Sequence, residues 1–467
     1  MENQSGGSDG EKKRFLPVLV FLGFIAIGAV VVTWVTTRGE PAVVGPPPTL
    51  PEYSPPTSLS PRTDVDQSDT TSPEANVVTN TDTAAPQSST TTAPPAPVVT
   101  VRADGTGDFM LLQAAIDQAQ PGDVIEVSGG EWGEQVIQSV GSPDAWLRIT
   151  AAPGERPIIR GVNDGRSGFE LDGASFVEIS GFEIIGPSNT SSGAGVRIIN
   201  SSHHIRVEDN VIHDFPGNGV EVIESGTVAV VDNEIFGNSR RSKFQTSGVS
   251  FFKPFGDDDE GFENVISGNT VYDNENTVPN DREEITDGNC LIMDNTRWPN
   301  GEYEYPGETL IENNVCFDNG GRGIHVLKAD NVYVVNNTLF NNLRTDSIEG
   351  GELSADDARN VLFRNNLVWP REEEDALLVG RSESVGFDNN VYVLPSGGQG
   401  DFEETAVVVR DPELVNPTTD PSAADFSPEG GSVLLGTGSV EESPLLDQAA
   451  TERPPIPTPG ALEVRPR

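Results

Sequence analysis

An asparagine that recurs within a short strand-like pattern constrains the fold of this chain more than any other feature. The pattern occurs as DNVI, DNEI, GNTV, NNVC, NNTL, NNLV and NNVY, with its asparagines at Asn210, Asn233, Asn269, Asn314, Asn337, Asn366 and Asn390. Successive asparagines are 23, 36, 45, 23, 29 and 24 residues apart, so the basic unit has about 23 residues and several units carry insertions. Apolar residues alternate with polar ones on both sides of each asparagine, which is typical of short β-strands.

A repeat unit of this length cannot bury its apolar residues alone, so it must stack on its neighbours. Stacked coils form one parallel sheet on each face, and each asparagine can hydrogen-bond to the asparagine above it. The leucine spacing of leucine-rich repeats is absent, and propeller blades need units of ~40 residues. The repeat therefore predicts an all-β parallel β-helix, a solenoid, over residues 99–445, followed by a C-terminal tail over residues 446–467.

An aromatic residue follows the asparagine by three positions in most units. These residues are Phe236, Tyr272, Phe317, Phe340 and Trp369, with His213 and Val393 in the same register at the ends. Residues that share a register stack on one another in neighbouring coils. We therefore expect these rings to form wall or core rather than platforms for sugars.

A short helix is expected before the first coils. Asp108 can cap a helix over residues 109–119 that places Leu112, Ala115 and Ile116 on one face, and PGD follows directly after it. This segment predicts a short N-terminal capping helix for the solenoid.

The N-terminal region has the pattern of a membrane anchor. Residues 15–35 form an uncharged stretch of 21 residues, long enough to cross the ~30 Å hydrocarbon layer, and Lys12, Lys13 and Arg14 precede it. We expect a transmembrane helix over 15–35, a cytoplasmic tail over 1–14 and an extracytoplasmic β-helix. Residues 36–98 are rich in Pro, Thr and Ser and predict a disordered stalk. The alternative for the apolar stretch is a cleaved secretory signal.

Charge and cysteine content exclude some classes of function. The chain has 73 acidic and 29 basic residues and a formal net charge of -44, which repels nucleic acid and suits solubility in salt. Only two cysteines are present, Cys290 and Cys316, too few for a disulfide framework and without metal-site spacing. Because Cys316 occupies a core register, two buried free thiols are expected.

A candidate site emerges when Gly248, Cys290 and Gly323 are aligned on successive coils. The alignment brings together acidic and amide side chains from one coil, which are Asp287, Asn289 and Asp294. It places beside them the basic side chains of the next coil, which are Arg322, His325 and Lys328. The alternative is that the acidic and amide residues only make turns and that the basic ones are surface charges balancing nearby acids.

These residue types suit cleavage of a polyuronate by β-elimination. A cation neutralises the uronate carboxylate, which lowers the pKa of the adjacent C–H, and a base removes that proton. Asp287 and Asp294 could hold calcium, which prefers carboxylate oxygens. Arg322, His325 and Lys328 could then serve as anion clamp and base, and histidine is the better base on its ordinary pKa.

Residues in the insertions could bind substrate. Lys253 lies in a locally basic stretch, and the polar loop NTRWPNGEYEYPGE carries Trp298, Tyr303 and Tyr305, whose rings could stack on sugars. A second pair of catalytic carboxylates, as in glycoside hydrolases, could come from Glu221 with Glu352, or from residues 257–259.

Several of these motifs resemble a known family. The helix followed by PGD, the N-N-x-hydrophobic coils and the closing DPELV…DFSPEGGS tract, over residues 99 to about 445, resemble the pectate-lyase-like superfamily. DGNCLIMDN with GGRGIHV one coil later is similar to a subgroup described as right-handed parallel β-helix repeat proteins of polysaccharide specificity. That subgroup has a glycine where this chain has Cys290. The resemblance implies a right-handed helix and a polysaccharide partner, but the superfamily includes lyases, hydrolases, epimerases, adhesins and inert surface proteins.

Two functions follow as hypotheses. The first is a surface-tethered polysaccharide lyase acting on an acidic glycan, with calcium as cofactor. The second is a non-catalytic glycan-binding or cell-surface module that uses the same face.

Overall fold

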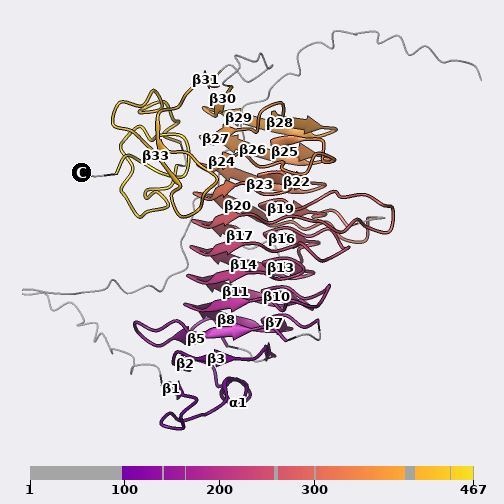
Figure 1. The fold of residues 1–467 in the computed structure, drawn as a ribbon, viewed down its shortest axis with the longest axis vertical. Coiled ribbons are helices and arrows are strands. Elements are labelled where there is room, and N and C mark those ends of the chain that lie inside the picture. Colours follow the sequence, from indigo (N-terminus) through magenta and orange to yellow (C-terminus); the bar gives the residue numbers. More distant parts are fainter. Residues whose placement is uncertain are drawn as a thin grey trace, which may run out of the picture. The chain divides into compact units, whose positions relative to one another are not determined.

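The computed structural model describes residues 97–138, 141–162, 165–256, 261–298, 301–394, 405–441 and 443–465, and those up to residue 409 coil into a β-helix of three parallel sheets (Figure 1). Sheet A consists of β1 (Val98–Val101), β2 (Val124–Val127), β5 (Leu147–Ala151), β8 (Ser175–Ser180), β11 (His203–Glu208), β14 (Gly226–Val231), β17 (Phe262–Ser267), β20 (Glu308–Glu312), β23 (Asp330–Val335), β26 (Arg359–Arg364) and β29 (Glu383–Asp388). Sheet B consists of β3 (Glu131–Trp132), β6 (Ile158–Arg160), β9 (Glu183–Ile185), β12 (Val211–His213), β15 (Glu234–Phe236), β18 (Thr270–Tyr272), β21 (Val315–Phe317), β24 (Thr338–Phe340), β27 (Leu367–Trp369), β30 (Val391–Val393) and β31 (Val407–Val409). Sheet C consists of β4 (Gln135–Ile137), β7 (Phe169–Asp172), β10 (Val196–Ile199), β13 (Val220–Ile223), β16 (Val249–Phe252), β19 (Leu291–Asp294), β22 (Ile324–Leu327), β25 (Gly351–Asp356) and β28 (Asp375–Gly380). The predicted parallel β-helix is confirmed.

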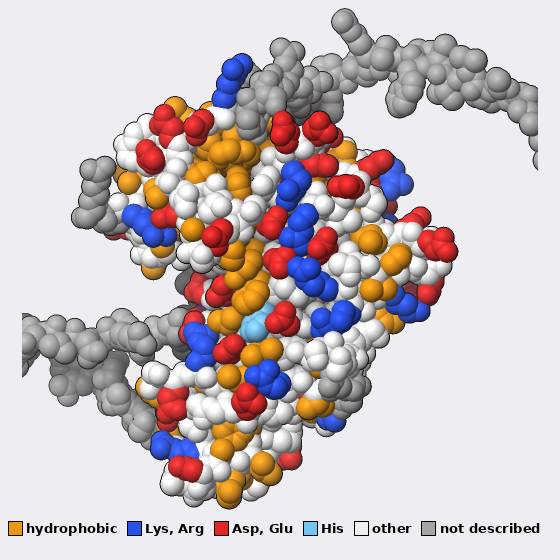
Figure 2. Space-filling view, in the orientation of Figure 1, with side chains coloured by type: hydrophobic (Ala, Val, Ile, Leu, Met, Phe, Trp, Pro, Cys, Tyr) orange, Lys and Arg blue, Asp and Glu red, His pale blue; other side chains and the backbone are white. Residues whose placement is uncertain are grey.

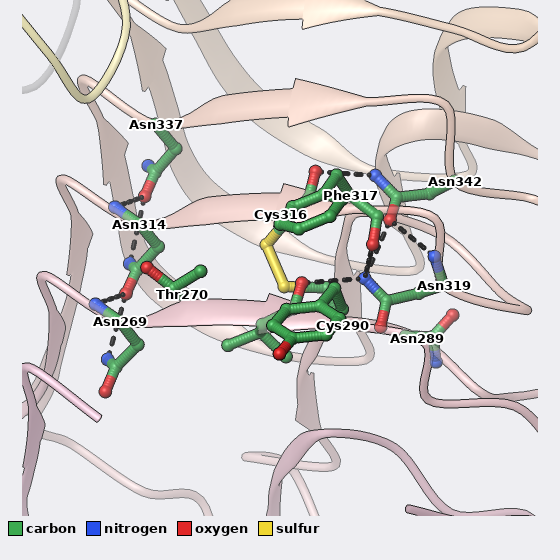
Figure 3. Close-up of a disulfide and its surroundings, with 12 residues drawn as sticks. Asn269, Thr270, Asn289, Cys290, Asn314, Cys316, Phe317, Asn319, Asn337 and Asn342 are labelled. Atoms are coloured by element: carbon green, nitrogen blue, oxygen red, sulfur yellow. Dashed lines mark hydrogen bonds between the residues drawn. A yellow bond between two sulfur atoms is a disulfide. The ribbon is translucent and has the colours of Figure 1, made fainter. Parts of the chain in front are cut away.

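The recurring asparagines form a continuous ladder at the turn between sheets A and B. In each step the backbone N–H and the side-chain Nδ2 of one asparagine donate to Oδ1 of the next, as from Asn269 to Asn314 (3.0 and 2.9 Å) and from Asn314 to Asn337 (3.0 and 2.9 Å; Figure 3). The preceding residue has a left-handed backbone, for example Asn313 (φ 55°) and Asn336 (φ 54°), which asparagine tolerates better than most side chains. The predicted asparagine stacking is confirmed.

A second ladder, which the sequence analysis missed, lies at the turn between sheets B and C. Its members are Asn238, Asn274, Asn319 and Asn342, each five residues after an asparagine of the first ladder, and the bonding pattern is the same. The last step ends on a carboxyl group, because Oε1 and Oε2 of Glu352 accept from N and Nδ2 of Asn342 (2.6 and 2.8 Å). Glu352 is fully buried, and burial raises its pKa to about 8.

A column of glycines precedes the strands of sheet C, where the chain passes close to the core side chains of sheet B. At Gly248 an added Cβ would lie 2.5 Å from a methyl group of Val271, so a side chain cannot be accommodated there. On the next coil this column holds Cys290, which is bonded to Cys316 in β21 (Figure 3). The prediction of two free thiols is therefore wrong: the two cysteines replace a glycine and an apolar core residue, and their sulfurs meet inside the helix.

The disulfide is expected to contribute about 3 kcal/mol to the free energy of unfolding, because it closes a loop with a sequence separation of 26 residues. The double variant Cys290→Gly, Cys316→Val restores the pairing seen at Gly248 and Val271, so it removes the cross-link without a cavity. Urea denaturation with and without reductant measures the effect. Reductant should destabilise the native protein and leave the variant unchanged, whereas equal stability of both proteins in all conditions would contradict the prediction.

The predictions for the N-terminal region agree less well with the structure. The structure has one helix here, α1 (Leu112–Ile116), which is shorter than the predicted 109–119 and packs Leu112, Ala115 and Ile116 against the first strands. Asp108 does not cap it, because its carboxylate accepts from N and Oγ1 of Thr100 (2.9 and 2.7 Å). The predicted membrane span over 15–35 and all but the end of the stalk lie outside the described residues. Within those, no helix is long and apolar enough to cross a membrane.

The residues after β31 form an irregular C-terminal segment, residues 410–465, which includes the antiparallel pair β32 (Leu414–Asn416) and β33 (Asp425–Pro428) (Figure 1). This segment packs back against the later coils. Phe426 contacts the rings of Phe317 and Phe340 on sheet B at centroid distances of 5.3 and 5.2 Å. The residues beyond 445 take part, since Gln448 Nε2 donates to Oγ1 of Thr270 (2.9 Å).

Candidate functional site

The outer face of sheet C carries the predicted constellation, because the strand register agrees with the sequence alignment. Ile292 of β19 pairs with His325 of β22, and His325 with Ser354 of β25. Their neighbours in each strand are in the hydrophobic core, so these three side chains point outward. Two residues further along, Asp294 pairs with Leu327 and Leu327 with Asp356, which also point outward.

The loop before β19 brings Asp287 to this face. Nδ2 of Asn289 donates to Asp287 Oδ1 (3.0 Å), and Oδ1 of Asn289 accepts from the backbone N–H of Arg322 on the next coil (2.9 Å). Asn289 is fully buried, so it fixes both neighbours. The structure therefore brings Asp287 and Arg322 together, as the sequence predicted, and it does so through a buried amide.

The two aspartates share an environment that favours their neutral forms. Burial raises the pKa of Asp287 to about 6, although Asn289 and Arg322 oppose the shift. Burial and the nearby charge of Asp287 raise the pKa of Asp294 to about 7, with Lys328 acting in the opposite direction. The two carboxyl groups are thus close enough for the charge of Asp287 to act on Asp294.

His325 is almost completely buried, with 6% of its surface exposed, although it lies on the outer face of the sheet. Burial and the neighbouring charge of Arg322 hold its pKa well below the usual range, so the imidazole is neutral. Its Nδ1 has no hydrogen-bond partner among the described residues. A neutral ring with an unpartnered nitrogen is able to take up a hydrogen bond or a proton, and a ligand reaches this buried nitrogen only if the side chains that cover it move.

Arg322 is held by two loops. Its Nη1 donates to the carbonyl of Thr286 (3.3 Å) and its Nη2 to the carbonyl of Glu349 (2.5 Å), while Nε has no partner among the described residues. Gly350 packs directly on the guanidinium, since an added Cβ would lie 2.5 Å from Nε. The side chain therefore holds the two loops in place, and its unpartnered Nε is covered by Gly350.

Replacing Arg322 with lysine is expected to lower the free energy of unfolding by about 2 kcal/mol, because one ammonium cannot reach both carbonyls and leaves one unpaired. The matched control is Arg381→Lys. Arg381 is exposed and pairs with Asp356 (3.1 Å), so its replacement should change stability by no more than about 0.5 kcal/mol. Urea denaturation measures both. Unchanged stability of Arg322→Lys with lost glycan binding would instead assign Arg322 to the substrate alone.

The predicted substrate-binding residues meet in one cluster beside this site. Nζ of Lys253 lies 5.0 Å from the ring centroid of Trp298, and the ring of Tyr303 lies 5.2 Å from that of Trp298. Phe255, which the sequence analysis did not select, packs on Tyr303 at 5.1 Å and is exposed. The hydroxyl of Tyr303 donates to the carbonyl of Gly256 (2.6 Å), which joins the two insertions. An aromatic surface with an adjacent cation can bind a sugar ring that carries an anion.

Other predictions do not fit the geometry. Tyr305 is not an exposed platform, because it is buried and its hydroxyl donates to Oε2 of Glu263 (2.8 Å). Glu221 and Glu352 cannot form a catalytic pair: Glu221 lies on the outer face and accepts from Arg197 Nε (2.8 Å), whereas Glu352 ends the interior ladder. Residues 257–259 lie outside the described residues.

A calcium ion at Asp287 and Asp294 would need further oxygen ligands from other groups. In the part of the chain that the structure describes, no three or more His, Cys, Asp or Glu side chains gather as a metal site. Calcium takes six to eight oxygen ligands, and carbonyl, amide and water oxygens can provide most of them. Thr286 and Asn295 are hydrogen-bonded to the two aspartates, and their side-chain oxygens are further candidate ligands for a calcium ion beside Asp287 and Asp294.

Asp356 is a site residue that the sequence analysis missed. It follows Asp294 and Leu327 in the outward register of sheet C, and its charge acts on Arg322. The signal was present in the sequence, since ELSAD aligns with GIHVL once Glu352 is matched to Gly323. The glutamate in a glycine position concealed that register.

Comparisons with known proteins agree with the fold. The family described as "right handed beta helix region" matches residues 158–296 and 279–400. A pectate lyase, Pel9A, is similar over 79% of this chain and 96% of its own, with a TM-score of 0.50 and 15% identity. An alginate lyase from Paenibacillus sp. str. FPU-7 covers 63% of this chain and 97% of its own (TM-score 0.38, 15% identity), and a rhamnogalacturonan lyase covers 69% and 91% (0.41, 14%). A search of curated proteins found no match. At these identities the likeness shows the fold alone.

Proposed function

Because this chain belongs to the right-handed β-helix family, in which ligands must lie on an outer face of a solid core, we propose that it acts on polysaccharide at the outer face of sheet C. The preferred reaction is cleavage of an acidic glycan by β-elimination. One observation carries the proposal: His325, whose Nδ1 has no partner among the described residues, lies beside Arg322, which Asn289 in turn joins to Asp287.

In the proposed reaction Arg322 binds the uronate carboxylate through its remaining donors. This pairing offsets the positive charge that holds the pKa of His325 down, so the ring becomes a stronger base when substrate is bound. His325 takes the proton from C5, the electron pair forms the C4=C5 double bond, and the C4–O bond breaks. The departing oxygen takes a proton from Lys328, which is exposed at the end of β22, or from solvent.

We further propose that Asp287 and Asp294 hold calcium, which would neutralise the uronate carboxylate. Calcium at 100 times its Kd should raise the free energy of unfolding by about 2.7 kcal/mol, and this effect should disappear in Asp294→Asn. Thermal denaturation with calcium or chelator measures it without reference to activity. Equal melting temperatures in both conditions would exclude calcium from this site.

The alternative is a non-catalytic glycan-binding module. It is favoured by the backbone carbonyls that already engage Arg322 and by the cluster of Lys253, Trp298 and Tyr303, which needs no chemistry to bind a sugar. The test is the ultraviolet absorbance of new unsaturated ends when residues 97–467 meet pectins, alginates and glycosaminoglycans with calcium. Absorbance supports the lyase, whereas glycan binding without absorbance supports the module.

The disulfide supports an extracytoplasmic location for the β-helix. Bonds such as Cys290–Cys316 form and persist in oxidising compartments and are rare where thiols are kept reduced. We propose that the β-helix is extracytoplasmic and tethered to the cell membrane by the apolar stretch at residues 15–35.

A further inference from the structure

Sheet B has an outward-facing column of aromatic rings that the proposed function does not use. The ring centroids of His213 and Phe236 are 4.7 Å apart, those of Phe236 and Tyr272 5.0 Å, and those of Tyr272 and Phe317 4.8 Å, all stacked. In Figure 2 a stripe of hydrophobic side chains runs along the β-helix beside the C-terminal segment. The ring faces are occupied by one another, so the column offers its edges.

The C-terminal segment covers the later part of this column and leaves a cavity of about 430 Å³ against it. The apolar lining includes Tyr272, Phe317 and Phe426. The opposing walls come from positions more than 100 residues apart in the sequence, as Tyr272 and Phe426 illustrate. The volume lies in the usual range of small-molecule sites, which form preferentially where two parts of a protein meet.

Polar groups converge on the same cavity. Glu234 lines the cavity, and its Oε1 accepts from the hydroxyl of Tyr272 (2.8 Å). Asp425 pairs with Arg465 (3.3 Å), and Nε2 of Gln448 donates to Oγ1 of Thr270 (2.9 Å). An apolar floor with a few oriented polar groups matches a sugar ring, which has C–H faces and hydroxyl edges.

We propose that this cavity binds an uncharged sugar unit and serves as a second, non-catalytic glycan site. The charged groups that line the cavity indicate which class of sugar it can bind. Three carboxylates, those of Asp232, Glu234 and Asp425, line the cavity with a single guanidinium, Arg465, which is already paired. A uronate would face unbalanced negative charge, whereas the hydroxyls of a neutral sugar can donate to the carboxylates.

The second site is independent of the proposed lyase activity, because it lies on sheet B and not on sheet C. A polysaccharide with both neutral and acidic units could be held on sheet B while an acidic unit lies on sheet C. The full described domain, with its C-terminal segment, is needed for the cavity.

Isothermal titration calorimetry with neutral disaccharides (cellobiose, lactose and N,N′-diacetylchitobiose) and with digalacturonate tests the proposal. We expect at least one neutral disaccharide to bind and Glu234→Ala to weaken it by about tenfold. The matched control is Glu183→Ala, which has the same register on sheet B two coils away and lies outside the cavity. His325→Gln should leave this binding unchanged.

Three outcomes would overturn the proposal: no binding of any neutral disaccharide at millimolar concentration, digalacturonate binding that Glu234→Ala weakens as much as it weakens the neutral sugar, or equal weakening by Glu183→Ala and Glu234→Ala. Glu234→Ala removes the hydrogen bond from the Tyr272 hydroxyl, and Glu183→Ala removes a contact with His213, so the melting temperatures of both variants are measured; similar values show that lost binding is not lost folding. A fourth outcome, loss of neutral binding in His325→Gln, would also overturn it, because it would move the sugar to sheet C. Absent lyase activity would leave the result on sheet B unaffected.

Discussion

Replacing His325 with glutamine is expected to lower the turnover of an acidic glycan by roughly 10²–10⁴-fold, the usual contribution of a positioned general base. Glutamine keeps a polar side chain of similar reach between Ile292 and Ser354 but cannot take up a proton. Binding of the glycan should persist, because Arg322 and the cluster of Lys253, Trp298 and Tyr303 are unchanged. Initial rates from the absorbance of unsaturated ends, with binding measured separately, give the comparison.

The matched control is Glu221→Gln, which lies in the same outward ladder of sheet C as His325, three strands away. It should keep full turnover, because nothing in the proposed chemistry reaches it. If His325→Gln retained the native rate, His325 would not be the base, and Lys328 would be the next candidate. If both variants lost activity equally, the effect would arise from the sheet and not from the site.

The second large effect is on stability as a function of pH. In the folded chain the pKa of Glu352 is raised by burial to about 8, above the usual 4.5. Between pH 4.5 and about pH 8, Glu352 therefore holds a proton in the folded state that it has lost in the unfolded state. This contribution to stability is complete below the ordinary pKa and is lost as pH rises through about 8. For Glu352 alone it is on the order of 4–5 kcal/mol.

Other buried carboxyls act in the same direction. Burial raises the pKa of Asp294 and of Glu312 to about 7 each, and that of Asp287 to about 6. Urea denaturation at about pH 5 and about pH 8.5 should show a clear loss of stability at the higher pH. Glu352→Gln should reduce this loss, and the exposed Glu383→Gln should not. Greater stability at the higher pH would show that Glu352 is ionised in the folded protein.

The fold could be read from the sequence because its repeat is local. Each asparagine of the first ladder sits in a short strand pattern, so the period, the sheets and the aromatic register followed from spacing alone. The second ladder was equally regular, five residues after the first, but its asparagines lie among loop residues without strand alternation. The disulfide was missed because it joins two columns of the coil, and only the packing of sheet C on sheet B shows that Cys290 and Cys316 face each other.

The candidate site could be predicted as far as strand register determines it. Asp294 and His325 lie in strands, and their neighbourhood followed from aligning Gly248, Cys290 and Gly323. The states of the side chains could not be predicted, because burial decides them: the neutral His325 and the tethered Arg322 depend on loops folded over the sheet. Cys290 does not disturb this face, since its side chain enters the core.

The C-terminal segment changes how a stack of repeats should come apart. Solenoids commonly fray from their ends, because each repeat contacts only its neighbours. Here one segment hydrogen-bonds successive residues of the turn between sheets A and B, from Gly268 (to Gln448, 3.2 Å) and Asn313 (to Leu446, 2.9 Å) to Asn389 (to Thr437, 2.7 Å). These hydrogen bonds, with those of Asn336 and Asn365, attach five successive coils to one segment. The five coils should therefore unfold together in a single cooperative event. Amide hydrogen exchange would then be slowest and most uniform in the C-terminal coils, and graded toward the N-terminal ones.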